Sequence, residues 1–158
     1  MTKKADFNAE EWSAVLEGPP IAGMMVITAE RGGTLRESVS MGQAYLEARK
    51  QQDAGELLDD ILAARPELDP KRFSSPDELK TKGLERLGEA VALLDSKADA
   101  GEVEAYKRFV LAVATKVANA HREGGVLGMG GKPVSENEQR TLDEIASTLG
   151  VEGQTPAP

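Results

Sequence analysis

The sequence predicts an all-α fold, a single-domain bundle of about six or seven helices. Helix-start signals recur along the chain, and apolar side chains repeat at spacings of three and four residues. Aromatic residues make up only 4% of the chain, a composition that favours helices over strands. With 158 residues, the chain is long enough to form one domain with a substantial core.

The first helix is predicted to begin at a capping box. In the pattern Asn8-x-x-Glu11, each side chain can accept a hydrogen bond from the backbone N–H of the other residue. Phe7 and Trp12 stand where a hydrophobic staple would enclose this start.

A break is predicted at Gly18-Pro19-Pro20, because glycine often follows a helix end and proline suits the first turn of a new helix. Residues 20–31 are apolar on nearly every side, so a central, buried second helix is expected there. Thr34-x-x-Glu37 then opens a third helix. The expected core face of this third helix consists of Leu35, Val39, Gly42 and Leu46.

The next two helices flank a proline-rich connection. A short helix is expected near Gly55 to Arg65, and its inward residues are Leu57, Leu58, Ile61 and Leu62. The segment Ser75-Pro76-Asp77-Glu78 opens the fifth helix, since it combines an N-cap, a proline at the first helical position and a glutamate at the third. The apolar stripe of that helix is Leu84, Leu87, Val91 and Leu94.

The last two helices are predicted over residues 101–122 and 135–149. The sixth has the apolar stripe Val103, Tyr106, Val110, Val113 and Val117. The last opens at Ser135-x-x-Glu138, and its inward residues are Leu142, Ile145 and Leu149. The domain is therefore expected over residues 5–150, followed by a disordered tail over residues 151–158.

A glycine-rich segment separates the last two helices. Five of the eight residues from Gly124 to Gly131 are glycine, and the other three are Val126, Leu127 and Met129. Two interpretations are open. These apolar side chains could bind a protein partner, or they could fold back and close one end of the bundle.

The same region carries a family resemblance. It rests on a helix that ends Val117-Ala118-Asn119-Ala120, on Glu123-Gly124-Gly125, and on Val134-Ser135-Glu136-x-Glu138, which opens a helix ending at Leu149-Gly150. In these features the chain resembles the bacterial TerB-like proteins, all-helical domains related to tellurite-resistance protein B. The resemblance is best over residues 100–150. Residues 22–48 share the resemblance loosely, because they are similar to the region that carries it. Two explanations of this internal similarity are open: the chain contains two related helical hairpins, or two alanine-rich helices are alike by chance.

The resemblance implies a role in divalent-metal binding or in stress-response complexes at the membrane. The chain departs from the family where the usual Ala-Asp-Gly is replaced by Arg122-Glu123-Gly124 and by Ala29-Glu30-Arg31-Gly32, so the aspartates are missing. About eight extra residues also separate the glycine pair from Ser135. The carboxylates that could still bind a metal, if the two hairpins pack together, belong to Glu30, Glu123 and Glu138.

Composition excludes several classes of function. The net charge of -8 argues against a nucleic-acid partner, which needs a basic surface. The chain has no cysteine, which excludes disulfides, zinc–thiolate sites and thiol catalysis. No secretory signal is visible and no apolar run approaches the roughly 20 residues of a membrane span. A cytoplasmic protein without membrane insertion is therefore expected.

No catalytic residue can be assigned. His121 is the only histidine and borders the apolar face in the last turn of its helix, where a structural role is favoured. Glu56, Asp59 and Asp60 share one side of a helix and could bind a hard cation, although such faces are usually solvated. The glycine-rich segment lacks the spacing of a phosphate-binding P-loop.

The sequence therefore predicts a non-catalytic cytoplasmic interaction or sensory module of TerB-like type, which binds an unidentified protein partner. The first alternative is a divalent-metal-binding stress-response protein, and the second is a small enzyme without a recognisable motif. A divalent cation is the one cofactor that the sequence leaves possible. The sequence does not indicate the oligomeric state.

Overall fold

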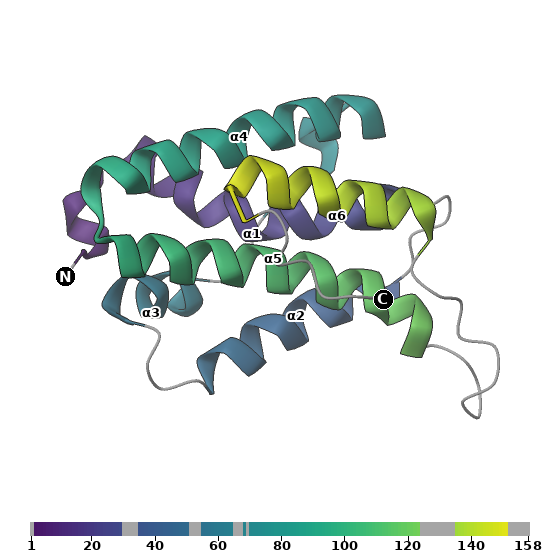
Figure 1. Cartoon of the computed structure of the whole chain (residues 1–158), viewed down its shortest axis with the longest axis horizontal. Coiled ribbons are helices and arrows are strands. Elements are labelled where there is room, and N and C mark those ends of the chain that lie inside the picture. The colour runs from purple at the N-terminus through teal and green to yellow at the C-terminus, as the bar shows by residue number, and fades with distance from the viewer. Residues whose placement is uncertain are drawn as a thin grey trace.

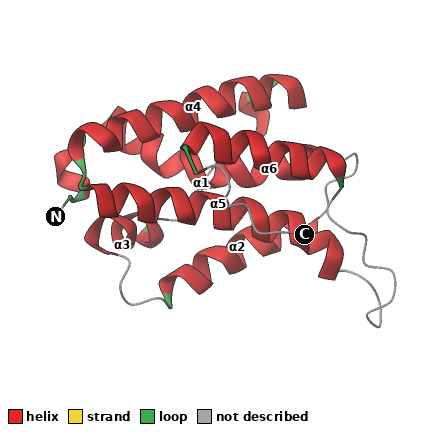
Figure 2. Ribbon diagram, in the orientation of Figure 1, coloured by secondary structure: helices red, strands yellow, loops and turns green. Residues whose placement is uncertain are grey.

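In a computed structural model of the chain, the residues that can be described are 2–29, 35–50, 55–64, 68, 70–123 and 135–151. Of residues 35–40, 70 and 121–123, only the backbone is described. The described residues form helices and turns, with no strand among them, which confirms the all-α prediction (Figures 1 and 2). The elements are η1 (Lys4–Asp6), α1 (Ala9–Ala29), α2 (Leu35–Arg49), α3 (Gly55–Ala63), η2 (Pro70–Arg72), α4 (Pro76–Lys97), α5 (Ala100–Glu123) and α6 (Glu136–Leu149).

The helices pack as one bundle around α1 and α5. Helix α1 packs chiefly on α4 and α5, while α2 and α3 cover the opposite side of α5 (Figure 1). Helix α6 rests against α4, α1 and α5. Helix α1 contacts α4 and α5 far more extensively than it contacts α2, although α2 follows it in the chain. Core packing, and not order in the chain, therefore decides which helices are neighbours. Among the described helices, none has the length and apolar character that crossing a bilayer requires.

The predicted start of α1 is confirmed. The Asn8 N–H donates to Glu11 Oε2, and the Glu11 N–H donates to Asn8 Oδ1, both at 2.9 Å. The rings of Phe7 and Trp12 pack together with their centroids 5.6 Å apart, as the staple requires. The local pattern was sufficient here because every partner lies within five residues of the others.

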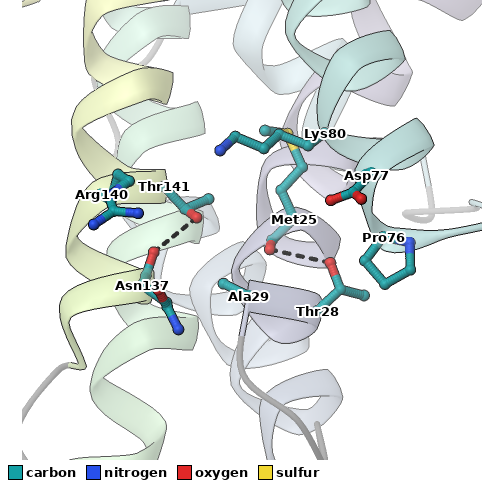
Figure 3. A pocket seen from close by; sticks show the side chains of 9 residues that line it. All are labelled: Met25, Thr28, Ala29, Pro76, Asp77, Lys80, Asn137, Arg140 and Thr141. Carbon is teal, nitrogen blue, oxygen red and sulfur yellow. Dashed lines mark hydrogen bonds between the residues drawn. The ribbon is translucent and has the colours of Figure 1, made fainter.

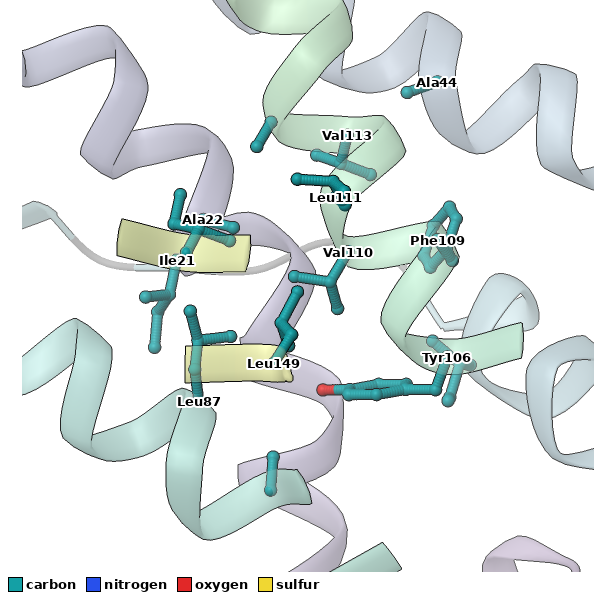
Figure 4. Packing of buried hydrophobic residues seen from close by; sticks show 14 of the residues in the cluster. Ile21, Ala22, Ala44, Leu87, Tyr106, Phe109, Val110, Leu111, Val113 and Leu149 are labelled. Carbon is teal, nitrogen blue, oxygen red and sulfur yellow. The ribbon is translucent and has the colours of Figure 1, made fainter. Parts of the chain in front are cut away.

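The predicted break at Gly18-Pro19-Pro20 is wrong, because α1 continues through both prolines to Ala29. Proline has no N–H, so Pro19 cannot donate to the carbonyl of Val15, four residues earlier. The hydroxyl of Tyr106 on α5 donates to that carbonyl instead, over 2.7 Å. Tyr106 is 0% exposed, and Figure 4 shows its ring reaching from α5 towards α1. A buried carbonyl thus regains the hydrogen bond that the proline removed.

Gly18 makes room for this hydrogen bond. A Cβ atom at position 18 would lie 2.1 Å from the Tyr106 hydroxyl oxygen, far inside contact distance. A Cβ on the residue before a proline also disfavours helical backbone, and glycine avoids that clash. The glycine that suggested a helix end therefore serves a close contact between α1 and α5.

The predicted core faces of α3, α5 and α6 are confirmed, since their inward residues are all buried. On α4, Leu87 and Leu94 are buried, but Leu84 and Val91 are only half-buried. The α4 core face is instead completed by Leu79, Gly83 and Ala90.

The predicted face of α2 is wrong where its side chains are described. Leu46 is 54% exposed, and Met41, Ala44 and Tyr45 are buried in its place. Tyr45 packs edge-on against Phe109 of α5, with ring centroids 4.9 Å apart. An aromatic pair of this kind adds to the gain from burial, which favours the face of α2 that carries Tyr45.

Helix α6 ends at Leu149, as predicted, and the chain remains part of the core two residues beyond it. Gly150 adopts a left-handed conformation with φ of 76°, which glycine tolerates without strain. The Val151 N–H then donates to the Ala146 carbonyl at 2.9 Å, and the Val151 side chain is buried. Val151 therefore belongs to the core, while residues 152–158 of the predicted tail lie outside the described residues.

A carboxylate on α1 fastens α4 and the connection before it. Glu17 accepts hydrogen bonds from Arg72 at 2.7 Å and from Arg86 at 3.0 Å, and its side chain is 14% exposed. Partial burial raises the pKa of Glu17, but the hydrogen bonds from the two arginines outweigh burial and hold this pKa below its ordinary value. The carboxylate is therefore ionised in the folded protein at neutral pH.

The contact at Gly18 predicts an unusual result for a glycine-to-alanine change in a helix. Gly18→Ala should lower the free energy of unfolding by about 1–3 kcal/mol through overpacking, although alanine is intrinsically the better helix former. The loss should be smaller in a Tyr106→Phe background, which lacks the clashing oxygen. Gly88→Ala on α4 is the control, because a Cβ there meets nothing within 4 Å and should be neutral or stabilising. Denaturant unfolding is measured for the natural chain, the Gly18→Ala and Tyr106→Phe single variants, their double variant and the Gly88→Ala control. An equal loss in both backgrounds would contradict the contact.

The Glu17 cluster predicts a pH-dependent stability. Because the pKa of folded Glu17 is lowered, the carboxylate stabilises the fold above the ordinary pKa of 4.5, and this contribution is lost as the pH falls through the lower folded pKa. Glu17→Gln should therefore cost about 1 kcal/mol at pH 7 and less at pH 3, by denaturant unfolding. Glu85→Gln, which changes an exposed carboxylate of α4, should show a much smaller cost. A cost for Glu17→Gln that does not change with pH would refute the role of the charge.

Candidate functional site

A pocket of about 240 Å³ lies where α1 ends and where α4 and α6 begin (Figure 3). We call the surface around it the pocket end. Its lining residues are Met25, Thr28 and Ala29 of α1, Pro76, Asp77 and Lys80 of α4, and Asn137, Arg140 and Thr141 of α6. In Figure 1, α5 also ends and α2 also begins at this end of the bundle.

Two helix caps fix the walls of the pocket. At the start of α4, Ser75 Oγ accepts a hydrogen bond from the Glu78 N–H at 3.1 Å, with Pro76 in the first turn. At the start of α6, the Ser135 N–H donates to Glu138 Oε2 at 2.9 Å and the Glu138 N–H donates to Ser135 Oγ at 3.1 Å. Both predicted starts are confirmed, and each cap holds the first turn of its helix in place.

The floor of the pocket depends on a close contact between α1 and α4. A Cβ atom at Gly83 would lie 2.8 Å from the sulfur of Met25 and 3.0 Å from a methyl group of Ile21. The missing side chain at Gly83 therefore lets the two helices approach. Met25 is 2% exposed and forms an apolar floor between them.

Most polar groups of the pocket are already bound within the protein. Thr28 Oγ1 donates to the Met24 carbonyl at 3.0 Å, and Thr141 Oγ1 donates to the Asn137 carbonyl at 2.9 Å. Lys80 extends from α4 towards α6, and its Nζ lies 2.9 Å from Glu144 Oε2 (Figure 3). These groups shape the pocket more than they offer contacts to a ligand.

Arg140 and Asp77 are the exceptions. Both side chains are exposed, and neither makes a hydrogen bond or ion pair with another described residue. They come from α6 and α4, on opposite walls of the pocket (Figure 3). The pocket thus presents one uncompensated positive group and one uncompensated negative group.

A second hollow, of about 220 Å³, lies beside the Glu17 cluster. Its arginines, Arg72 and Arg86, are already paired with Glu17, and its Lys82 pairs with Glu78. The second hollow therefore has few charges to offer, and the pocket end is the better candidate.

Most of the predicted site residues lie outside the described part of the chain. This holds for the predicted partner-binding residues Val126, Leu127 and Met129 and for the predicted metal ligand Glu30. Glu123 is the last residue of α5, one residue beyond the predicted helix end, and its side chain is not described. Glu138 is described, and its buried carboxylate closes the cap of α6.

The acidic residues Glu56 and Asp60 hold the N-terminal segment. Glu56 lies 3.5 Å from the Lys3 ammonium group, and Asp60 Oδ2 accepts a hydrogen bond from the Lys4 N–H at 3.0 Å. Asp59, the third member of that predicted cluster, is exposed. Within the described residues, no three carboxylate or histidine side chains gather as a metal site would require.

The sequence indicated the frame of the pocket but not its lining. Both helix starts were visible as capping patterns, because a cap is a local feature. Arg140 and Asp77 carry no signal of their own, since a single charged residue on a helix usually faces solvent. Only the packing of α4 beside α6 brings them to one pocket.

Comparisons with known protein families, with curated proteins and with solved structures find no match for this chain.

Proposed function

We propose that this chain is a non-catalytic cytoplasmic interaction or sensory module of TerB-like type, and that it binds through the pocket end. The observation behind this proposal is the pair of uncompensated charges, Arg140 and Asp77, on opposite walls of a pocket built from three helices. Charged groups that a fold leaves unpaired in a concave surface are the groups that a ligand or partner can use.

The rigidity of the frame supports a binding role. The walls are the capped first turns of α4 and α6, and the floor is a buried part of α1. Sites built on helices hold their side chains more firmly than sites built on loops, which lowers the entropy lost on binding.

The chemistry of the lining also favours binding over catalysis. The guanidinium of Arg140 presents a planar fork of N–H donors and no acceptor, so it suits recognition of a negative group better than proton transfer. Lys80 is held by Glu144. The pocket therefore supplies fixed charges and few groups that could exchange a proton.

Two further features agree with a TerB-like role. Helix α5 ends at Glu123, and α6 begins at the Ser135–Glu138 box, which are two of the positions on which the resemblance rests. The segment that holds the predicted partner-binding residues, 124–134, connects these two helices.

A charge reversal tests the proposal. Arg140→Glu should reduce capture of a protein partner at least about tenfold, because loss of a charged contact and its replacement by a repulsive one costs more than 1.4 kcal/mol. Arg108→Glu reverses an exposed arginine on α5, outside the pocket, and should leave capture unchanged. The measurement is affinity capture by the full chain from cells that express it naturally, with equal circular dichroism as the check on folding. Equal capture by both variants would exclude the pocket end as the binding surface.

A further inference from the structure

We infer that the pocket end binds a small zwitterion of the amino-acid type, with its carboxylate on Arg140 and its ammonium group on Asp77. This inference rests on the proposed function, because it names the ligand class of the same surface.

The balance of charge in the pocket selects a zwitterion. Glu144 compensates Lys80 across 2.9 Å, which leaves Arg140 and Asp77 as the uncompensated pair among the described lining residues. A simple anion would be attracted by Arg140 but repelled by Asp77. A simple cation would be attracted by Asp77 but repelled by Arg140. A ligand with one charge of each sign satisfies both walls.

The chemistry of each wall fits its half of the ligand. A guanidinium presents a planar fork of N–H donors that matches the two oxygens of a carboxylate. A carboxylate such as that of Asp77 accepts hydrogen bonds from an ammonium group, which has three donors and no acceptor. Both side chains are exposed, and neither makes a hydrogen bond or ion pair with another described residue. Ligand binding therefore need not break such an interaction first.

The size and the apolar part of the pocket limit the ligand further. A volume of about 240 Å³ has room for an amino acid with a modest side chain. Ala29 and Pro76 supply apolar surface beside the charges. We therefore expect aliphatic or thioether side chains to bind better than acidic or basic ones.

The test is thermal unfolding of the full chain with zwitterions and with matched analogues that lack one charge. The panel is alanine, methionine, 4-aminobutyrate and diglycine, which vary the spacing between the two charges. The analogues are N-acetylmethionine, which lacks the ammonium group, and methionine amide, which lacks the carboxylate. At least one zwitterion should raise the midpoint by roughly 3–5 °C at a concentration about ten times its dissociation constant. Methionine should exceed both of its analogues.

Two variants and two control variants test whether the ligand binds at the pocket end. Arg140→Gln and Asp77→Asn should each abolish the rise in midpoint. Arg108→Gln on α5 and Asp95→Asn on α4 remove exposed charges of the same kind outside the pocket and should retain it. Chemical-shift changes in amide NMR spectra should centre on residues 77, 80, 140 and 141.

Several results would overturn the inference. They are no rise with any zwitterion, an equal rise with N-acetylmethionine, an equal rise with methionine amide, or shift changes confined to other parts of the chain. If zwitterions fail while partner capture still depends on Arg140, the proposed binding surface stands and the ligand class is wrong. If zwitterions bind while capture ignores Arg140, the pocket is a ligand site and the partner surface lies elsewhere.

Discussion

The continuity of helix α1 depends on one hydrogen bond, from the Tyr106 hydroxyl to the Val15 carbonyl. Helix α1 is the element that contacts α4, α5 and α6 together, and it contains two consecutive prolines in its middle. Without a replacement donor, the buried Val15 carbonyl would stay unsatisfied and the helix would favour a kink at that point. The second half of α1 places Met25 against Gly83, so a continuous α1 also positions the pocket floor.

A second constraint is the acidic composition of the chain. The chain has a net charge of -8, and each carboxylate that is buried or partly buried needs a hydrogen-bond donor. Glu17 finds two arginines, Glu138 finds the N–H of Ser135, and Asp60 finds the N–H of Lys4. Glu138 and Asp60, which were considered as cation ligands because of their charge, thus stabilise a helix start and a contact between two segments. Asp77 differs because no described residue pairs with it, and this is why it belongs to the candidate site.

How much of this could be predicted from the sequence depends on the range of each interaction. The capping boxes at Asn8 and Ser135 were predicted correctly, because their partners lie three residues apart. The valine stripe of α5 was also predicted correctly, since a central helix must bury one face wherever its neighbours lie. The proline break was wrong because the donor that rescues α1 comes from α5, far away in the chain. The face of α2 was wrong for a similar reason, because Phe109 of α5 decides it. The pocket could not be predicted, since three distant segments form it.

The Tyr106 hydroxyl replaces the donor that Pro19 lacks, and a double-mutant cycle tests this replacement most directly. Pro19→Ala restores an N–H that can bond to the Val15 carbonyl, so the carbonyl no longer depends on Tyr106. Tyr106→Phe should then cost about 1–3 kcal/mol in the natural sequence and at least about 1 kcal/mol less in the Pro19→Ala background, by denaturant unfolding. An equal cost in both backgrounds would contradict the account, because it would mean that the hydroxyl does not substitute for the missing N–H.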